Sequence, residues 1–365
     1  MTLPTARPTS VVAEPPIRVM IVDDSAYVRH IVSKHLSEAP GLTVVGVARD
    51  GEEALHLLPQ LQPDVLTLDV EMPRRDGLTT LREIMTHSPL PVVMLSSLTA
   101  SGAEATLQAL ALGAVDFVTK PEARANVGAV MEEVIAKIRV AARAHIYPLS
   151  PGTSQLVAGT HSASKRPLAP RPALARTAGK VVVIGASTGG PRALSTVISQ
   201  LPEDLPAALL IVQHMPAGFT LSLADRLNEI SALSIKHAAA GDRLLTGHGL
   251  LAPGGFHMVL DDDHHIALNR APTQHGVRPA VDVTMQAIAE RYRGDTIGVV
   301  LTGMGSDGTR GARRINQVGG HVIAEDESSC VVWGMPRSVA EAGVADEILP
   351  LPQIAPAIVR AVQGA

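Results

Sequence analysis

The stretch Lys180-Val-Val-Val-Ile-Gly-Ala-Ser-Thr-Gly-Gly-Pro191 decides the fold of the second half of the chain. Its first residues, as far as Ile184, are mostly β-branched and predict a buried strand. A glycine-rich turn and a helical pattern as far as Gln200 follow at once. A strand that runs directly into a helix is the repeating unit of parallel sheets that helices cover on both faces.

The same unit recurs downstream of this stretch. We expect strands at Ala208–Val212 and Thr296–Leu301, and helices at Leu221–Glu229 and Val281–Tyr292. Between them, the short apolar runs of Ser234–Arg270 favour hairpins. Residues 179–365 are therefore predicted to form one α/β domain with a parallel sheet.

Upstream, residues 17–144 alternate short apolar runs with amphipathic stretches in the same way. The predicted strands are Ile17–Val22, Leu42–Ala48, Val65–Leu68, Val92–Leu95 and Asp116–Val118. Helical patterns separate these strands, so we expect a second α/β domain built on a five-stranded parallel sheet.

Residues 145–178 join the two predicted domains and have a different composition. Proline, serine, threonine, glycine and alanine dominate, and the hydrophobic periodicity disappears. This composition is typical of a flexible linker. The linker is also basic, with Lys165, Arg166, Arg171 and Arg176 and no acidic residue, so a docking strip is the alternative to a solvated tether.

The overall composition limits the function classes. A formal net charge of -4 and an aromatic content of 2% argue against a nucleic-acid-binding protein. The segment Met1–Pro16 lacks a signal-peptide pattern, and no apolar run is long enough for a transmembrane helix. A single cysteine, Cys330, fits a reducing compartment. We therefore expect a cytoplasmic protein without membrane insertion.

Polar side chains stand at the ends of the predicted strands in the first domain. Asp23 and Asp24 follow the first strand, and Asp69 follows the third. Ser96 follows the fourth and Lys120 the fifth. The carboxyl ends of parallel strands form one crevice, and three converging carboxylates suit Mg²⁺. A carboxylate beside Mg²⁺ and a lysine can accept a phosphoryl group, although each aspartate alone could be a helix cap.

This pattern resembles the receiver domain of two-component response regulators, over about residues 17–144. The resemblance implies a flavodoxin-like fold. It also implies that Asp69 is phosphorylated, that Asp23 and Asp24 complete the Mg²⁺ site, and that a sensor histidine kinase is the phosphodonor. The switch residues of that family are matched by Ser96, Phe117 and Lys120.

Ser187 lies between small residues, in the turn that follows the strand beginning at Lys180. Small neighbours permit a sharp turn that presents the hydroxyl group, and the following helix offers N–H donors to a developing oxyanion. Glycine-rich turns of this kind also cradle phosphates. Here, however, the phosphate-binding interpretation lacks a following lysine and the G-x-G-x-x-G spacing.

A nucleophilic serine needs a base and an orienting acid. His214 closely follows the Ala208–Val212 strand, and Asp307 lies in the loop after the Thr296–Leu301 strand. With Ser187 they occupy three strand ends, which we expect on one edge of one sheet, so the pattern predicts a catalytic triad. A lone histidine is more often structural, and the order serine, histidine, acid differs from that of nucleophile-elbow hydrolases.

Four stretches resemble signatures of the bacterial chemotaxis response regulator protein-glutamate methylesterase/protein-glutamine glutaminase family. They are Gly185–Pro191, Gln213–Pro216, Leu301–Gly308 and Ser328–Pro336. With the receiver and the linker in front of them, the resemblance extends over nearly the whole chain.

This resemblance implies a role for each site residue. Ser187 would be the nucleophile, His214 the general base and Asp307 the orienting acid. Thr188 would lie beside the site, and the amide of Met304 would donate to the oxyanion. The implied reaction needs no cofactor: it removes γ-methyl esters from glutamates of chemoreceptors, releases methanol, and extends to deamidation of receptor glutamines. The implied partners are the cytoplasmic helices of chemoreceptors, and we expect a monomer.

Three alternatives compete with this interpretation. A response regulator that binds DNA would need a compact helix-turn-helix with a basic helix, which the α/β pattern of residues 179–365 does not match. A non-catalytic scaffold would tolerate the loss of triad residues, yet all three are present. An esterase of the same family could also serve receptors that do not control swimming.

Two further features receive structural interpretations. The cluster Asp261-Asp-Asp-His-His265 contains metal-ligand residue types, but it separates the apolar runs Met258–Leu260 and Ile266–Leu268. We therefore interpret it as a hairpin turn rather than a metal site. Cys330 is interpreted as a buried structural thiol.

Overall fold

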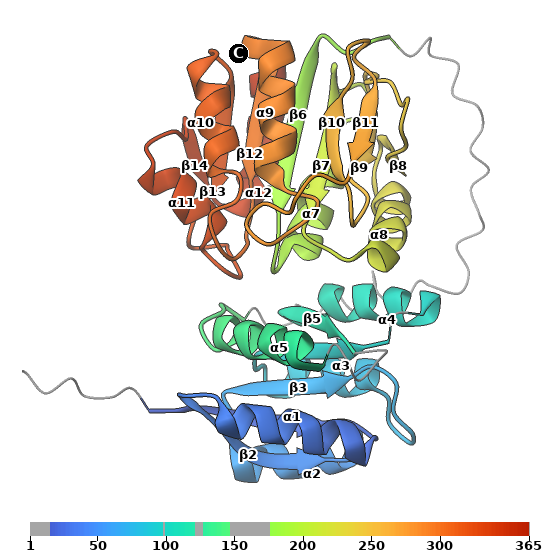
Figure 1. Cartoon of the computed structure of the whole chain (residues 1–365), viewed down its shortest axis with the longest axis vertical. Coiled ribbons are helices and arrows are strands. Elements are labelled where there is room, and N and C mark those ends of the chain that lie inside the picture. The colour runs from blue at the N-terminus through green and yellow to red at the C-terminus, as the bar shows by residue number, and fades with distance from the viewer. Residues whose placement is uncertain (1–14, 98, 121–126, 147–175, 365) are drawn as a thin grey trace, which may run out of the picture.

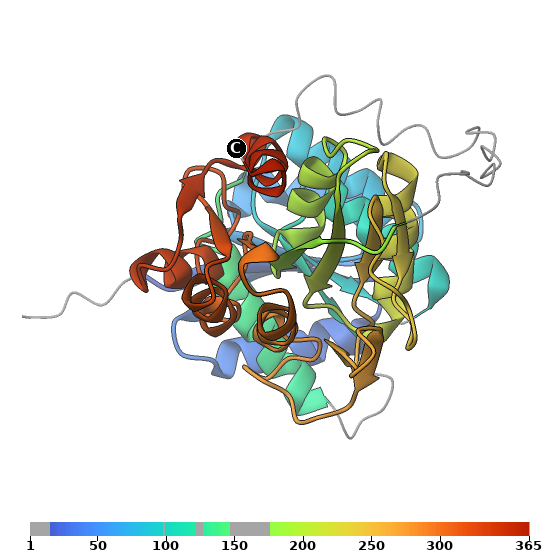
Figure 2. The ribbon, with the colours of Figure 1, turned by 90° about the horizontal axis from the view of Figure 1, so that it is seen from above.

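The structure, a computed structural model, describes residues 15–97, 99–120, 127–146 and 176–364. These residues form two units, each built on a parallel sheet, with the N-terminal unit below the C-terminal unit in Figure 1. Figure 2 looks down on the same arrangement, with the N-terminal unit in blue and cyan behind the other. The α/β class predicted for both halves of the chain is confirmed.

Some predicted features lie outside the described residues. They are the N-terminal segment 1–14 and residues 147–175 of the predicted linker, including Lys165, Arg166 and Arg171. None of the described helices combines the length and the apolar composition that crossing a bilayer requires.

The N-terminal unit has a five-stranded parallel sheet in the order β2-β1-β3-β4-β5. Its strands are β1 (Ile17–Val22), β2 (Leu42–Ala48), β3 (Val65–Asp69), β4 (Val92–Ser96) and β5 (Asp116–Thr119). Its helices are α1 (Ala26–Glu38), α2 (Gly51–Leu61), α3 (Gly77–His87), α4 (Ala100–Ala111) and α5 (Val127–Ala141). Both β3 and β4 are buried throughout, because helices cover both faces of the sheet.

Capping side chains determine where four of these helices begin. Ser25, Asp50, Asp76 and Thr99 each accept a hydrogen bond from a backbone N–H in the first turn of α1, α2, α3 and α4, respectively. Such caps satisfy donors that no helix carbonyl can reach. The loops from strand to helix are therefore held at one edge of the sheet, where the acidic residues lie.

The C-terminal unit has a seven-stranded parallel sheet in the order β14-β13-β12-β6-β7-β9-β8. Its strands are β6 (Lys180–Ala186), β7 (Ala207–Gln213), β8 (Ser234–His237), β9 (His248–Leu251), β12 (Thr296–Val300), β13 (His321–Glu325) and β14 (Glu347–Leu349). Its helices are α7 (Gly190–Ile198), α8 (Ala217–Ile230), α9 (Val281–Tyr292), the short η2 (Arg293–Asp295), α10 (Thr309–Gln317), α11 (Met335–Glu341) and α12 (Leu351–Gln363).

Two layers of helices cover this sheet. Alternate residues of β6 point to opposite faces: Val182 packs in a core with α7, α8 and α12, and Val183 in a core with α9, α10 and α11. This alternation follows from the period of two in a strand. The helix from Val281 to Tyr292 has the predicted bounds.

The prediction of hairpins across Ser234–Arg270 is only half right. Strands β8 and β9 pair in parallel with each other, and β9 pairs with β7, so both extend the main sheet. Short apolar runs show the same periodicity in either pairing mode, so the sequence pattern cannot separate them. Only β10 (His257–Leu260) and β11 (Ile266–Asn269) form a hairpin, and the cluster Asp261–His265 is its turn, as predicted.

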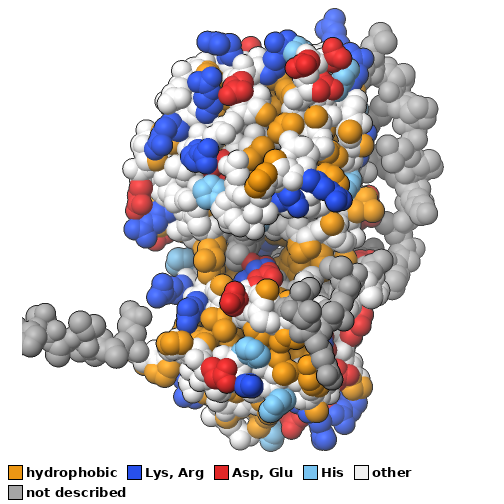
Figure 3. Space-filling model, viewed as in Figure 1, with side chains coloured by type: hydrophobic (Ala, Val, Ile, Leu, Met, Phe, Trp, Pro, Cys, Tyr) orange, Lys and Arg blue, Asp and Glu red, His pale blue; other side chains and the backbone are white. Residues whose placement is uncertain are grey.

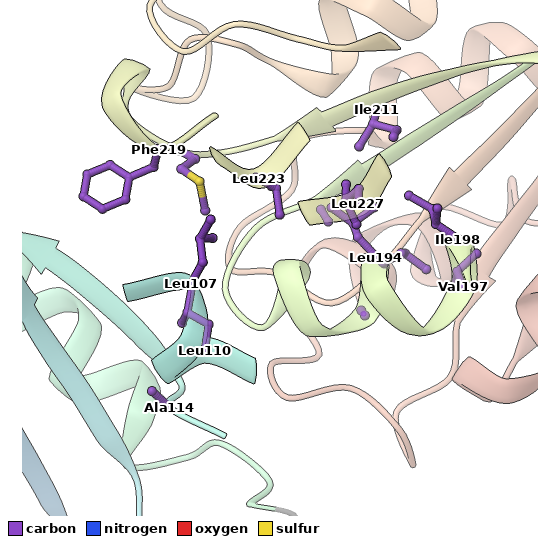
Figure 4. Packing of buried hydrophobic residues seen from close by; sticks show 14 of the residues in the cluster. Leu107, Leu110, Ala114, Leu194, Val197, Ile198, Ile211, Phe219, Leu223 and Leu227 are labelled. Carbon is purple, nitrogen blue, oxygen red and sulfur yellow. The ribbon is translucent and has the colours of Figure 1, made fainter. Parts of the chain in front are cut away.

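The two units share one hydrophobic cluster. Helix α4 packs against α7 and α8, and Figure 4 shows Leu107 and Leu110 of α4 on the side that faces Phe219 of α8. Phe117 on β5 also contacts Phe219, with ring centroids 4.4 Å apart. The N-terminal unit therefore covers the loop edge of the other sheet with apolar side chains.

Candidate active site

Ser187 lies in the tight turn between β6 and α7. Gly189 has a φ of 78°, in the region that favours glycine, and α7 begins at the next residue. The amide of Ser187 donates to the Thr302 carbonyl at 3.0 Å, and its carbonyl accepts from the Gly190 amide at 2.8 Å. The backbone of this turn is thus held on both sides.

Strand register places His214 beside Ser187. Strands β6 and β7 are parallel with Ala186 opposite Gln213, so the residues that follow, Ser187 and His214, stand next to each other. The amide of His214 donates to the carbonyl of Ala186 at 3.1 Å. The expected common edge of the sheet is present.

Asp307 is buried, and both of its carboxylate oxygens accept hydrogen bonds. His214 Nε2 (2.8 Å) and the Val281 amide (2.7 Å) bind one oxygen. The amides of Asp282 (2.8 Å) and Gly308 (2.9 Å) bind the other. Burial alone would raise the pKa of Asp307, but the hydrogen bond and charge of His214 and the backbone amides bring it below its ordinary value. Asp307 is therefore ionised at neutral pH and fixed in orientation.

The imidazole of His214 has one nitrogen committed to Asp307. Its Nε2–H donates to the carboxylate, a tautomer that we assign from this contact, and Nδ1 is left as the basic nitrogen. Within the described residues, no hydrogen bond joins His214 to Ser187. Catalytic contacts of this kind often tighten only around a bound substrate.

Gly303 lets the loop after β12 pass directly against Ser187. A Cβ atom at Gly303 would lie 2.6 Å from the Ser187 Cβ and 2.6 Å from the Met335 sulfur. The next residue, Met304, is 51% exposed. In the described part of the chain, no group accepts a hydrogen bond from the Met304 amide, so a free N–H donor lies in this loop.

Three polar residues that support the loop were not predicted from the sequence. Gln213 Nε2 donates to the Ser187 carbonyl at 2.8 Å, and Thr302 Oγ1 donates to the Thr188 carbonyl at 3.0 Å. Buried Glu325 accepts from the Thr302 amide at 2.8 Å, and burial raises the pKa of this carboxyl group. Of these three residues, only Gln213 has a feature in the sequence that indicates a special role: it is a polar residue at the end of an otherwise apolar strand.

A second histidine–aspartate pair borders the acid. His275 Nε2 lies 2.9 Å from Asp282 Oδ2 and 3.8 Å from Asp307 Oδ1. Asp282 is fully buried and also accepts from the Gly311 amide at 2.7 Å. Neither residue follows a strand directly, so the pattern of polar residues at strand ends does not predict them.

The acidic site of the N-terminal unit forms at the ends of β1, β3 and β5. Lys120 Nζ lies 2.7 Å from Asp69 Oδ2 and 2.8 Å from Asp23 Oδ2. Oxygens of Asp23, Asp24 and Asp69 all lie within 4.8 Å of one another. Carboxylate oxygens so close together fit a hard cation such as Mg²⁺.

Burial shapes the ionisation of this site. It raises the pKa of Asp69 to about 6, although the nearby charge of Lys120 acts in the opposite direction. Burial would lower the pKa of Lys120, but Asp69 and Asp23 together raise it. A charged lysine therefore faces a carboxylate that titrates not far below neutrality.

The two other predicted switch residues pack against neighbouring elements. Ser96 Oγ donates to the Gly102 carbonyl at 3.2 Å and accepts from Thr106 Oγ1 at 2.7 Å, both on α4. Phe117 is buried against Phe219 of the C-terminal unit. Both residues thus touch the part of the N-terminal unit that contacts the other unit.

Asp116, which precedes Phe117, was not predicted as a site residue. Its carboxylate accepts a hydrogen bond from the hydroxyl group of Thr188 and lies 3.2 Å from Lys137 Nζ. Cys330 is fully buried, as expected of a structural thiol, and burial raises its pKa.

Two family models match the chain. The model of the CheB methylesterase matches residues 182–358, and the model of the response regulator receiver domain matches residues 19–132. Both matches agree with the resemblances that the sequence motifs indicate.

Several proteins named protein-glutamate methylesterase/protein-glutamine glutaminase are similar to this chain over nearly its full length. The protein-glutamate methylesterase/protein-glutamine glutaminase of Symbiobacterium thermophilum is 50% identical over 362 residues, which cover 95% of this chain and 97% of that protein. The protein of the same name from Geobacillus kaustophilus is 46% identical over 350 residues, with 94% and 98% covered. The crystal structure of the Thermotoga maritima CheB methylesterase catalytic domain is 48% identical and covers 50% of this chain and 98% of that one, with a TM-score of 0.49.

Proposed function

Since this chain belongs to the CheB methylesterase family and carries a response regulator receiver domain, we propose that it is a phosphorylation-regulated serine hydrolase acting on chemoreceptors. Its reaction is that of a protein-glutamate methylesterase, which converts a glutamate γ-methyl ester to glutamate and methanol. The observation that carries the proposal is the bond between His214 and the buried Asp307 at the sheet edge that also holds Ser187.

In the proposed reaction, Ser187 Oγ attacks the ester carbonyl while Nδ1 of His214 takes the hydroxyl proton. A tetrahedral intermediate forms, and its oxyanion accepts hydrogen bonds from backbone donors, with the Met304 amide as our candidate. The intermediate expels methoxide, which leaves as methanol with the proton from His214. Water then attacks the acyl-enzyme by the same route and releases glutamate.

Asp307 has two tasks in this scheme. Its carboxylate orients the imidazole of His214, and its negative charge stabilises the imidazolium that forms during each step. Three backbone amides hold it ionised, so the acid itself takes no proton. We propose the same site for deamidation of receptor glutamines, because only the leaving group differs.

We propose that the receiver accepts a phosphoryl group on Asp69 from a sensor histidine kinase. Asp23, Asp24 and Asp69 would hold Mg²⁺, which would neutralise charge on the phosphoryl oxygens. Lys120 lies against the acceptor carboxylate and can donate to the same oxygens. Ser96 would do so after its hydroxyl group leaves the Gly102 carbonyl.

Regulation would operate through the contact between the two units. Phe117 packs on Phe219 and Asp116 binds Thr188, so the receiver touches the residue that follows the nucleophile. We propose that this contact blocks receptor access and that phosphorylation weakens it. A shift of about 1.4 kcal/mol would change the ratio of open to closed molecules tenfold.

We propose that residues 17–144 form the receiver, residues 145–178 the linker and residues 179–365 the catalytic domain. Cytoplasmic helices of chemoreceptors are the proposed substrate, and a cytoplasmic monomer the proposed form. The test is methanol release from methylated receptor membranes, with and without a phosphodonor. Release that requires neither Ser187 nor His214 would end the serine-hydrolase proposal.

A further inference from the structure

The solvent-facing side of α10 carries three arginines. Arg310, Arg313 and Arg314 stand at spacings i, i+3 and i+4, which place them on one side of the helix. Arg310 and Arg313 are exposed, and Arg314 is partly exposed. Nothing in the proposed hydrolysis uses them.

The arginines line a hollow between α9 and α10. Its lining consists of Gln286, Glu290, Arg310, Arg313, Arg314 and Gln317, and its volume is about 270 Å³. The two helices meet closely at Gly311, where an added Cβ atom would lie 2.5 Å from the Met285 Cβ. Polar side chains on two tightly packed helices thus form its walls.

The hollow has an excess of positive charge. Glu290 is its only acidic lining residue, and among the described residues no carboxylate forms an ion pair with any of the three guanidinium groups. The chain as a whole is acidic, with a formal net charge of -4. Figure 3 shows Lys and Arg side chains gathered on the part of the upper unit where Figure 1 places α10. Guanidinium groups bind carboxylates through bidentate hydrogen bonds, so the hollow suits an acidic ligand.

Its position relates it to the active site. Helix α10 begins two residues after Asp307, and Arg313 and Arg314 lie in its second turn. The hollow is formed by helices on one face of the sheet, whereas the receiver helix α4 contacts α7 and α8 on the other face. A ligand here therefore does not need the surface that the receiver covers.

Resting on the proposed function, we propose that this hollow, the α9–α10 exosite, binds glutamate carboxylates of the receptor helix that carries the ester. Each methyl ester derives from a glutamate, so a partly methylated substrate helix also carries free carboxylates. Such free carboxylates are the groups that exposed guanidinium side chains bind. The exosite thus favours substrate helices that carry free glutamates.

The test compares charge variants in methanol release from detergent-solubilised methylated receptor. The double variant Arg313→Glu, Arg314→Glu should raise KM about tenfold at low salt and leave kcat nearly unchanged. The double variant Arg313→Lys, Arg314→Lys keeps the charge and should restore most of the affinity. Arg360→Glu, on α12 at the other face of the sheet, is the control for a charge reversal elsewhere; it also removes the bond to Glu347 and should not raise KM. High salt should remove most of the difference between the wild type and the Glu variant.

Three results would overturn the proposal. If the wild type releases methanol and the Glu variant has the same KM, the exosite does not bind substrate, while the proposed function stands. If the Glu variant loses binding to phosphatidylglycerol vesicles and keeps its KM for solubilised receptor, the arginines bind lipid instead. If the wild type releases no methanol at all, the proposed function fails, and the exosite proposal fails with it.

Discussion

The carboxylate of Asp116 in the receiver accepts a hydrogen bond from the hydroxyl group of Thr188, the residue that follows Ser187. Both residues are buried, at 9% and 7% exposure, so the bond is largely shielded from water. Asp116 is also bound by Lys137, whose ammonium group donates to the carbonyl of Phe117 at 2.5 Å. A movement at Phe117 would therefore be transmitted through Lys137 and Asp116 to Thr188, the neighbour of the proposed nucleophile.

Removing this bond should raise the activity of the unphosphorylated enzyme. A hydrogen bond to a charged group contributes about 1.5–3 kcal/mol, so Asp116→Ala should open the contact and increase methanol release about tenfold or more. Asp116→Asn keeps a neutral acceptor and should give a smaller increase. Methanol release without phosphodonor is the measurement, and formation of an acid-labile phosphate on Asp69 when phosphodonor is added checks that the receiver still folds. Unchanged basal activity in both variants would show that the bond does not restrain the enzyme.

Loss of the nucleophile should nearly abolish turnover. Ser187→Ala should lower methanol release by about 10³-fold or more, because only binding and oxyanion stabilisation remain. Asp307→Asn should be nearly as severe, since the amide cannot hold the imidazole in the same tautomer. Ser195→Ala, in which a serine of α7 loses only its bond to the Pro191 carbonyl, is the matched control. Turnover close to that of the control in the Ser187 variant would contradict the assignment.

Gly303 should tolerate no side chain. Gly303→Ala places a methyl group within 2.6 Å of the Ser187 Cβ, so the loop or the nucleophile must move. We expect a loss of about 1–3 kcal/mol in the free energy of unfolding and a large fall in kcat. Gly179→Ala is the control, because its added Cβ meets nothing within 4 Å. Equal activity and equal denaturant midpoints in the two variants would refute the close approach.

Binding of Mg²⁺ to the receiver should depend on pH near the raised pKa of Asp69. Mg²⁺ competes with a proton that binds with a pKa of about 6, so its apparent affinity should fall about tenfold per pH unit below that value. Because the pKa of Asp69 is raised in the folded protein, protonated Asp69 adds to the free energy of unfolding of the metal-free protein at low pH. This contribution is lost as the pH rises through about 6. Calorimetric titration with Mg²⁺ measures the effect. Asp69→Asn cannot titrate and should bind Mg²⁺ weakly with a flatter profile, and a flat profile in the wild type would contradict the shift.

The grouping of Ser187, His214 and Asp307, and that of the acidic residues, could be predicted because each depends on where strands end. Ser187, His214 and Asp307 follow β6, β7 and β12, which are neighbours in the sheet. Periodicity locates strands, and parallel strands bring their carboxyl ends to one edge. Asp23, Asp69 and Lys120 also lie at strand ends in the N-terminal sheet. In the structure, Lys120 forms ion pairs with both aspartates.

The supporting contacts could not be predicted from periodicity. Asp282 lies in the first turn of α9 and reaches the acid only because that helix starts beside the loop after β12. Asp116 has the pattern of an ordinary strand residue, and its partner Thr188 belongs to the other unit. Contacts of this kind depend on how separate elements dock, and short-range sequence patterns carry no information on docking.

The most direct test is methanol release by the full-length chain from methylated receptor membranes, with and without a small phosphodonor. Wild type should release methanol slowly alone and at least about tenfold faster with phosphodonor and Mg²⁺. Asp69→Asn should stay at the slow rate under both conditions, and Ser187→Ala should release almost none. Equal acceleration of the wild type and Asp69→Asn by phosphodonor, or undiminished release by Ser187→Ala, would contradict a serine esterase that is controlled by phosphorylation of Asp69.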